Sequence, residues 1–243
     1  MWNFIENQIL AASSPLGTKT PMNNINFNEI SAIAFDFDGV ILDSVALKAD
    51  LFIASYPFKL KEHERQAILT YQAAHGGVGR VKKFEHFERA VFSREPDSKA
   101  VAALAKRYSC LLMERIPFCA ELPGARAFLQ RFEHQLSLHL VSGTSHDDLL
   151  NIVSDREMSS FFKTITGSPT GKVEAFTAIA KATDIAFEKI LAIGDSTTEY
   201  VAAQTLGMPF VAIVQAGEPN PFPVDIPVYH DLAHLSTAWP RSM

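Results

Sequence analysis

Short apolar runs that end in polar residues constrain the fold of this chain more than any other feature. The run from Ala32 to Phe37 is apolar except for Asp36, which is typical of a central parallel strand covered by helices on both faces. Similar runs follow at 136–141, 163–166, 190–193 and 210–214. Helical patterns separate them, over 125–132, 149–153, 172–182 and 197–206. Alternating strands and helices predict βαβ units, and therefore an α/β fold with a Rossmann-like parallel sheet.

Residues 46–118 interrupt this alternation. They contain no convincing strand pattern, and their apolar residues follow helical spacing over three stretches, about 62–73, 80–92 and 98–115. A glycine-rich segment lies between the first two stretches. We therefore expect a small all-α cap domain inserted after the first strand. The Rossmann-like core is then built from residues 29–45 and 119–243.

Composition and charge narrow the class of protein. The chain carries 22 basic and 27 acidic residues, a net charge of −5, so nucleic acid is a poor candidate for a partner. Its two cysteines form no CxxC pair, which favours reduced thiols and a cytoplasmic location. No apolar run approaches the roughly 18 residues that cross a membrane. Residues 1–28 are expected to be a mobile leader, and the chain to be a monomer or a homodimer.

Polar residues follow several of the predicted strands, where parallel strands bring ligands to one edge of a sheet. They are Asp36, Asp38, Ser142, Gly143, Thr144, Lys172, Asp195 and Glu199. Convergent carboxylates repel one another unless a cation lies between them, and hard oxygen ligands favour Mg²⁺. Lysine, serine and backbone amides complement a phosphoryl group. The residues alone therefore indicate metal-assisted phosphoryl transfer.

Four motifs in order resemble those of the haloacid dehalogenase superfamily. Residues 36–44 match the pattern DxDG[TV]xxDS, Ser142 matches the serine or threonine that ends a strand, and Lys172 matches the lysine that opens a helix. Residues 194–196 match the start of GDSxxD, but Glu199 replaces its last aspartate. The cap resembles that of the subfamily that includes phosphoglycolate phosphatase and β-phosphoglucomutase.

The resemblance implies a role for each carboxylate. Asp36 would be the nucleophile that forms an aspartyl-phosphate. Asp38 would protonate the leaving alcohol and later deprotonate the attacking water. Mg²⁺ would be held by Asp36, by the backbone carbonyl of Asp38 and by Asp195. Glu199 would bind the metal or lie just outside its ligands, or would be only a residue of the first helical turn.

Further residues would bind the substrate, a small phosphate ester. The resemblance implies that Ser142, with the amides of Gly143 and Thr144, binds phosphate oxygens and that Lys172 neutralises charge on Asp36. In the cap, one group flanks the glycine-rich segment and is expected to contact the leaving group, namely His75, Arg80 and Lys83. The family thus implies a Mg²⁺-dependent phosphomonoester phosphatase, acting on a metabolite such as a sugar phosphate.

Two alternatives stay open. A phosphomutase of the β-phosphoglucomutase type would share every motif, and Val40 in place of threonine also occurs in the mutases. A non-catalytic domain with the same fold would act as a binding module. Such modules usually lack the nucleophile or a metal ligand, whereas this chain has both Asp36 and Asp195.

Overall fold

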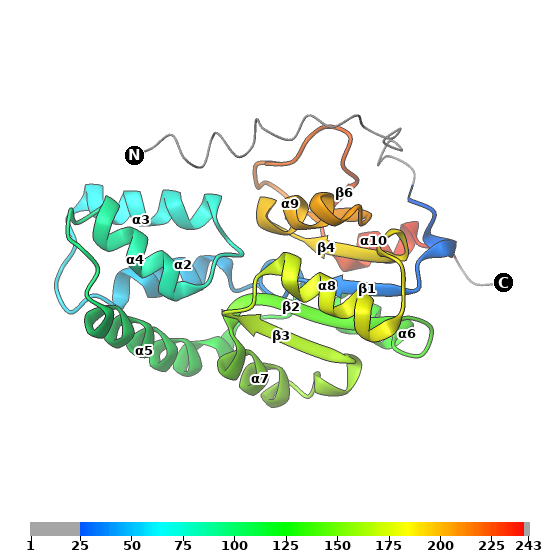
Figure 1. Ribbon diagram of the computed structural model, residues 1–243, viewed down its shortest axis with the longest axis horizontal. Coiled ribbons are helices and arrows are strands. Elements are labelled where there is room, and N and C mark those ends of the chain that lie inside the picture. The colour runs from blue at the N-terminus through cyan, green and yellow to red at the C-terminus, as the bar shows by residue number, and fades with distance from the viewer. Residues whose placement is uncertain (1–24, 241–243) are drawn as a thin grey trace.

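A parallel six-stranded sheet forms the centre of the computed structural model, which describes residues 25–240 (Figure 1). The strands are β1 (Ala32–Phe35), β2 (Ser137–Ser145), β3 (Thr164–Ser168), β4 (Ile190–Gly194), β5 (Phe210–Ile213) and β6 (Val228–Tyr229). Their order is β3-β2-β1-β4-β5-β6, and every neighbouring pair is parallel. The predicted Rossmann-like sheet is confirmed. Most of the predicted leader, residues 1–24, lies outside the described residues.

Helices cover both faces of the sheet because its strands are apolar on both sides. Ile33 and Phe35 of β1 point into a cluster with α6 (Ala125–Phe132), α7 (His146–Asp155) and α10 (Leu232–Ala238). The alternate residues Ala32 and Ala34 point into a second cluster, with α8 (Lys172–Thr183) and α9 (Thr197–Leu206). Short 3₁₀ turns complete the layers, at Phe27–Glu29, Ile116–Phe118, Ser159–Phe161 and Phe187–Lys189. The three layers leave the carboxyl ends of the strands as an open edge.

Of the helices between β1 and β2, four lie beyond that edge (Figure 1). They are α2 (Val45–Ala54), α3 (Glu62–Ala74), α4 (Arg80–Ala90) and α5 (Ser98–Arg115), and together they are called the cap below. Phe52 of α2 packs against α4 and α5, because its ring lies 5.2 Å from that of Phe84, 5.5 Å from that of Phe87 and 4.6 Å from that of Tyr108. The all-α insertion predicted after the first strand is thus present.

The sequence patterns missed three elements. Helix α2 was not predicted, because its sequence VALKADLFIA is apolar on nearly all sides and gives little helical periodicity. Strand β6 has only two residues, too few for a pattern of alternation. The C-terminal helix α10 is seven residues long. The predicted strand from Ala32 to Phe37 ends earlier, at Phe35.

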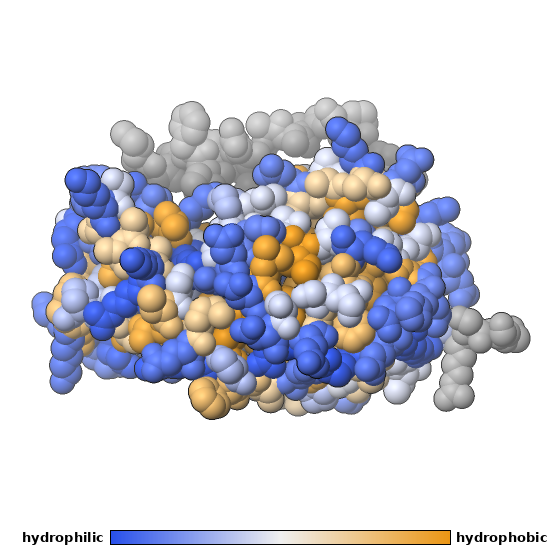
Figure 2. Space-filling view, turned by 90° about the horizontal axis from the view of Figure 1, so that it is seen from below, coloured by the Kyte–Doolittle hydropathy of each residue, from blue (hydrophilic) through white to orange (hydrophobic). Residues whose placement is uncertain are grey.

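The face shown in Figure 2 is mainly hydrophilic. On the face shown in Figure 2, hydrophilic side chains surround limited hydrophobic areas. The aromatic side chain of Phe118 is 89% exposed. Among residues 25–240 no helix combines the length and the apolar character that a membrane span requires.

One titratable side chain, His139, is buried within the sheet. Its ring nitrogens lie 2.9 Å from the hydroxyl of Ser137 and 2.8 Å from that of Thr164. Burial lowers the pKa of His139 to about 4, and the positive charge of Lys163 adds to the shift. The folded protein therefore keeps this imidazole neutral at pH values where the unfolded chain has begun to protonate it.

The pH dependence of stability tests whether His139 is neutral in the folded protein. Since the unfolded state binds more protons than the folded state between about pH 6.5 and pH 4, the free energy of unfolding must fall as the pH drops through that window. His139→Gln removes the titration, so the variant should lose roughly 2–3 kcal/mol of that fall. Urea unfolding at pH 7 and pH 4.5 measures it. An equal fall in both proteins would contradict the prediction.

Candidate active site

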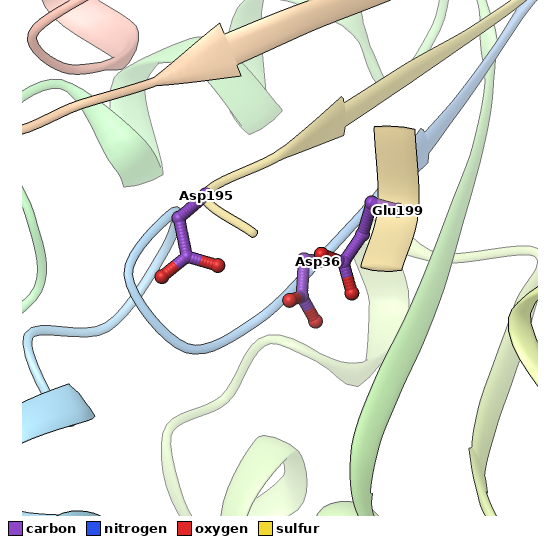
Figure 3. Close-up of side chains that lie close together, drawn as sticks. All are labelled: Asp36, Asp195 and Glu199. Carbon is purple, nitrogen blue, oxygen red and sulfur yellow. The ribbon is translucent and has the colours of Figure 1, made fainter. Parts of the chain in front are cut away.

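Three carboxylates, two of them buried and that of Asp195 partly exposed, meet at the carboxyl edge of the sheet (Figure 3). Asp36 follows β1 and Asp195 follows β4, and these strands are hydrogen-bonded neighbours. Glu199 lies in the first turn of α9, three residues after the N-cap Ser196. One oxygen atom from each carboxylate lies within 4.8 Å of the others. The adjacency of β1 and β4 therefore places residues far apart in the sequence in one cluster.

Lys172 balances part of this negative charge. As the first residue of α8, it places its Nζ atom 3.0 Å from Asp36 Oδ1, 2.8 Å from Glu199 Oε1 and 2.6 Å from the carbonyl oxygen of Val141. Burial alone would lower the pKa of Lys172, but the negative charges of Asp36 and Glu199 outweigh burial and raise it above its usual value. Lys172 is therefore a fixed positive charge beside Asp36.

The negative charge of the carboxylates that Lys172 does not balance suits a divalent cation. Burial raises the pKa of Asp36 to about 7, although Lys172 opposes the shift, and the carboxylates of Glu199 and Asp38 add to it. Burial and then repulsion by Asp36 and Glu199 raise the pKa of Asp195 well above its usual value. A bound cation would allow these carboxylates to ionise together. The donor set, oxygen atoms from three carboxylates, fits a hard cation.

Asp38 lies beside the cluster, in a network of donors. Its Oδ1 accepts a hydrogen bond from the Ser44 hydroxyl at 2.5 Å, while its Oδ2 lies 2.5 Å from Lys48 Nζ, 3.1 Å from Thr144 Oγ1 and 3.3 Å from Ser142 Oγ. Burial alone would raise the pKa of Asp38, but Lys48 and the hydroxyl groups lower it below its usual value. In this arrangement Asp38 is ionised.

Lys48 is a site residue that sequence analysis missed. It is buried on α2 and donates to both Asp38 and Thr144, the latter at 2.6 Å. A signal was present in the sequence, because Lys48 shares a helical face with the buried Leu51 and Phe52. A lone lysine on an apolar face needs a partner in the interior, but α2 itself was not predicted.

The phosphate-binding segment predicted at 142–144 lies directly under the cap. Gly143 and Thr144 line a cavity between cap and core, and Asp36, Asp38 and Asp195 line its core side. A Cβ atom added to Gly143 would lie 2.8 Å from the carbonyl oxygen of Gly77, closer than real Cβ contacts. The cap backbone therefore rests on the core backbone at this point, which requires a glycine.

The three predicted cap residues differ in their placement. Arg80 and Lys83 line the cavity, and Lys83 is buried, with its Nζ atom 2.5 Å from Gln72 Oε1. Burial lowers the pKa of Lys83 to about 7, and the charge of Lys48 contributes. His75 does not belong to the cavity lining; its ring stacks on Tyr71, with centroids 4.0 Å apart. The structure thus brings Arg80 and Lys83, but not His75, to the site.

Sequence comparison shows the family to which the protein belongs. Residues 33–213 match the family described as haloacid dehalogenase-like hydrolase. This match covers more than half of the chain, and the protein belongs to that family. A comparison with the sequences of curated proteins found no similar protein.

Solved structures share the fold at low sequence identity. CbbY from Rhodobacter sphaeroides, in complex with phosphate, is 17% identical, with a TM-score of 0.68 over 85% of this chain and 96% of that one. A predicted phosphoglycolate phosphatase from Haemophilus somnus is 15% identical, with a TM-score of 0.67 over 86% of this chain and 98% of that one. The hydrolase YfnB from Bacillus subtilis, bound to magnesium, is 20% identical, with a TM-score of 0.64 over 86% of this chain and 98% of that one. At these identities the similarity shows the fold alone.

The contact between Gly143 and Gly77 leads to a prediction. Gly143→Ala should force the cap segment 76–79 away from the core, since an overpacked contact costs about 1–3 kcal/mol. Amide hydrogen exchange in that segment should become about tenfold faster. Gly171→Ala is the matched control, because a Cβ atom there would meet nothing within 4 Å. Exchange as slow in Gly143→Ala as in the control would contradict the proposed contact.

Proposed function

We propose that the protein is a Mg²⁺-dependent phosphatase that hydrolyses a small phosphate monoester through an aspartyl-phosphate. The observation that carries the proposal is the buried pairing of Asp36 with Lys172, 3.0 Å apart, beside two further carboxylates. Such a pairing gives a nucleophile next to a fixed positive charge, which phosphoryl transfer requires. Membership of a hydrolase family supports the same reaction class.

Asp36 is oriented to attack phosphorus. Lys172 Nζ and the backbone amide of Phe37, the latter at 2.8 Å, both donate to Oδ1, and this fixes the plane of the carboxylate. Attack by Asp36 forms a bond to phosphorus as the bond to the alcohol oxygen breaks. Lys172 stabilises the negative charge on the transferring group.

The carboxylates of Asp36, Asp195 and Glu199, with the backbone carbonyl of Asp38, are the groups proposed to hold Mg²⁺. Bound there, the metal would neutralise charge on the phosphoryl oxygens. Glu199 is itself held by Lys172 and by the Ser196 hydroxyl. The magnesium bound by the similarly folded YfnB supports the choice of ion.

Asp38 is proposed to move the protons. When ionised and bound to Lys48, it suits the second half of the reaction, in which it takes a proton from the water that attacks the aspartyl-phosphate. The first half needs the protonated acid, which gives its proton to the leaving alcohol. Binding of the ester must therefore weaken the contact between Lys48 and Asp38, which is 2.5 Å long here.

The remaining residues are proposed to bind and enclose the substrate. Ser142, Gly143 and Thr144 would contact phosphate oxygens, a role supported by the phosphate complex of CbbY. The cap would exclude bulk water and open for release, as the interdomain movement described for YfnB suggests. Arg80 and Lys83 would contact the alcohol part of the substrate. We propose that this substrate is a sugar phosphate or a similar metabolite.

Phosphate release is the test of this function. Wild-type protein and Asp36→Asn are incubated with sugar phosphates, phosphoglycolate, nucleotides and an aryl phosphate, with Mg²⁺ and with EDTA. We expect Mg²⁺-dependent release, strongest on one ester, and a loss of at least about 10³-fold in Asp36→Asn. The variant keeps the size of the side chain and loses its nucleophilic charge.

Other outcomes would replace the proposal. Release that persists in Asp36→Asn would remove Asp36 as the nucleophile. No release on any ester, together with conversion of one phosphorylated hexose into an isomer, would identify a phosphomutase. Neither reaction, with unchanged cellular function of Asp36→Asn, would identify a binding module.

A further inference from the structure

One core carboxylate outside the metal cluster binds two helices of the cap. Asp148 of α7 forms an ion pair with Arg80, the first residue of α4, with Oδ2 2.6 Å from Nη2. The same oxygen accepts a hydrogen bond from the hydroxyl of Ser109 of α5 at 3.0 Å. Asp148 is 9% exposed. This buried carboxylate therefore joins the core to two separate cap helices.

Of the two terminal nitrogens of Arg80, one has partners and the other has none among residues 25–240. Its Nη2 atom also donates to the Ser145 hydroxyl, and its guanidinium lies 5.4 Å from the ring centroid of Tyr108. Its Nη1 atom is buried and has no hydrogen-bond partner among residues 25–240. Since Arg80 lines the cavity, Nη1 is the donor left to an acceptor on a ligand. An unsatisfied buried donor is costly, so a ligand oxygen there would be favoured.

We propose that Asp148 is a positioning residue, which holds Arg80 with Nη1 available to an oxygen of the leaving alcohol and fastens the cap to the core. The acceptor would be a hydroxyl or an anionic oxygen of the substrate. The statement about the substrate rests on the proposed phosphatase function. The statement about closure does not, because it concerns contacts between Asp148, Arg80 and Ser109 alone.

The geometry explains why Asp148 and not another residue has this role. Arginine donates from a planar fork, so fixing one nitrogen also fixes the direction of the other. Without the carboxylate, the Ser145 hydroxyl and the Tyr108 ring remain as contacts of Arg80, and neither carries a full negative charge. Removing one partner of a buried ion pair also leaves the other charge uncompensated.

The first experiment compares Asp148→Asn with Ser109→Ala. Asp148→Asn keeps the size but removes the charge; Ser109→Ala removes one hydrogen bond to Asp148 and leaves the ion pair with Arg80. For the best ester of the panel, we expect KM to rise about tenfold or more in Asp148→Asn, with a smaller change in kcat. Ser109→Ala should change KM less than about twofold. Equal KM values in Asp148→Asn and wild type would overturn the proposal.

Hydrogen exchange of segment 76–79 measures closure without any substrate. Asp148→Asn should exchange about tenfold faster there, and exchange at the wild-type rate would overturn the fastening role. If wild-type protein hydrolyses no ester, the phosphatase proposal fails, while this measurement still decides whether Asp148 fastens the cap.

A double variant with the two charges swapped distinguishes loss of the ion pair between Asp148 and Arg80 from loss of folding. The double variant Asp148→Arg with Arg80→Asp restores opposite charges across the same interface. We expect exchange of segment 76–79 to return toward the wild-type rate, while KM stays raised because no guanidinium projects from position 80. Fast exchange in a double variant whose thermal unfolding matches that of wild type would contradict the ion pair.

Discussion

The convergence of buried negative charge at the ends of β1 and β4 is the constraint on which the rest of the structure depends. Asp36, Asp195 and Glu199 lie within reach of one ion, and Lys172 supplies the positive charge that contacts two of them. Buried charges are tolerated only when they are paired or bound to a metal. The position of Lys172 at the start of α8 and the proposed Mg²⁺ site both follow from this requirement.

The sheet and the cap contribute different groups to the site. Strand order fixes the carboxylates, because β1 and β4 are neighbours at the centre of the sheet. The cap supplies no carboxylate to this cluster. It contributes instead the backbone that rests on Gly143 and the basic side chains of Lys48, Arg80 and Lys83 around the cavity. A cap that covers the site would exclude bulk water during the proposed phosphoryl transfer.

The chemistry of the core was more predictable from the sequence than the contacts between core and cap. Strands such as β1 are buried on both faces, so their apolar runs and the polar residues after them could be recognised. Lys48 was missed because the helix that presents it has no clear amphipathic pattern. The partnership of Asp148 with Arg80 joins residues distant in sequence, and no local pattern marks such a pair. His75 flanks the same glycine-rich segment as Arg80, yet it stacks on Tyr71 instead.

In the proposed mechanism, Asp36 carries the phosphoryl group during turnover. The most direct measurement is mass spectrometry of the protein quenched in acid within the first turnover of its best ester with Mg²⁺, followed by digestion. The peptide containing Asp36 should gain the mass of one phosphoryl group and lose it on mild alkaline treatment. A phosphoryl group found on another residue, or on none during continuing turnover, would contradict this mechanism.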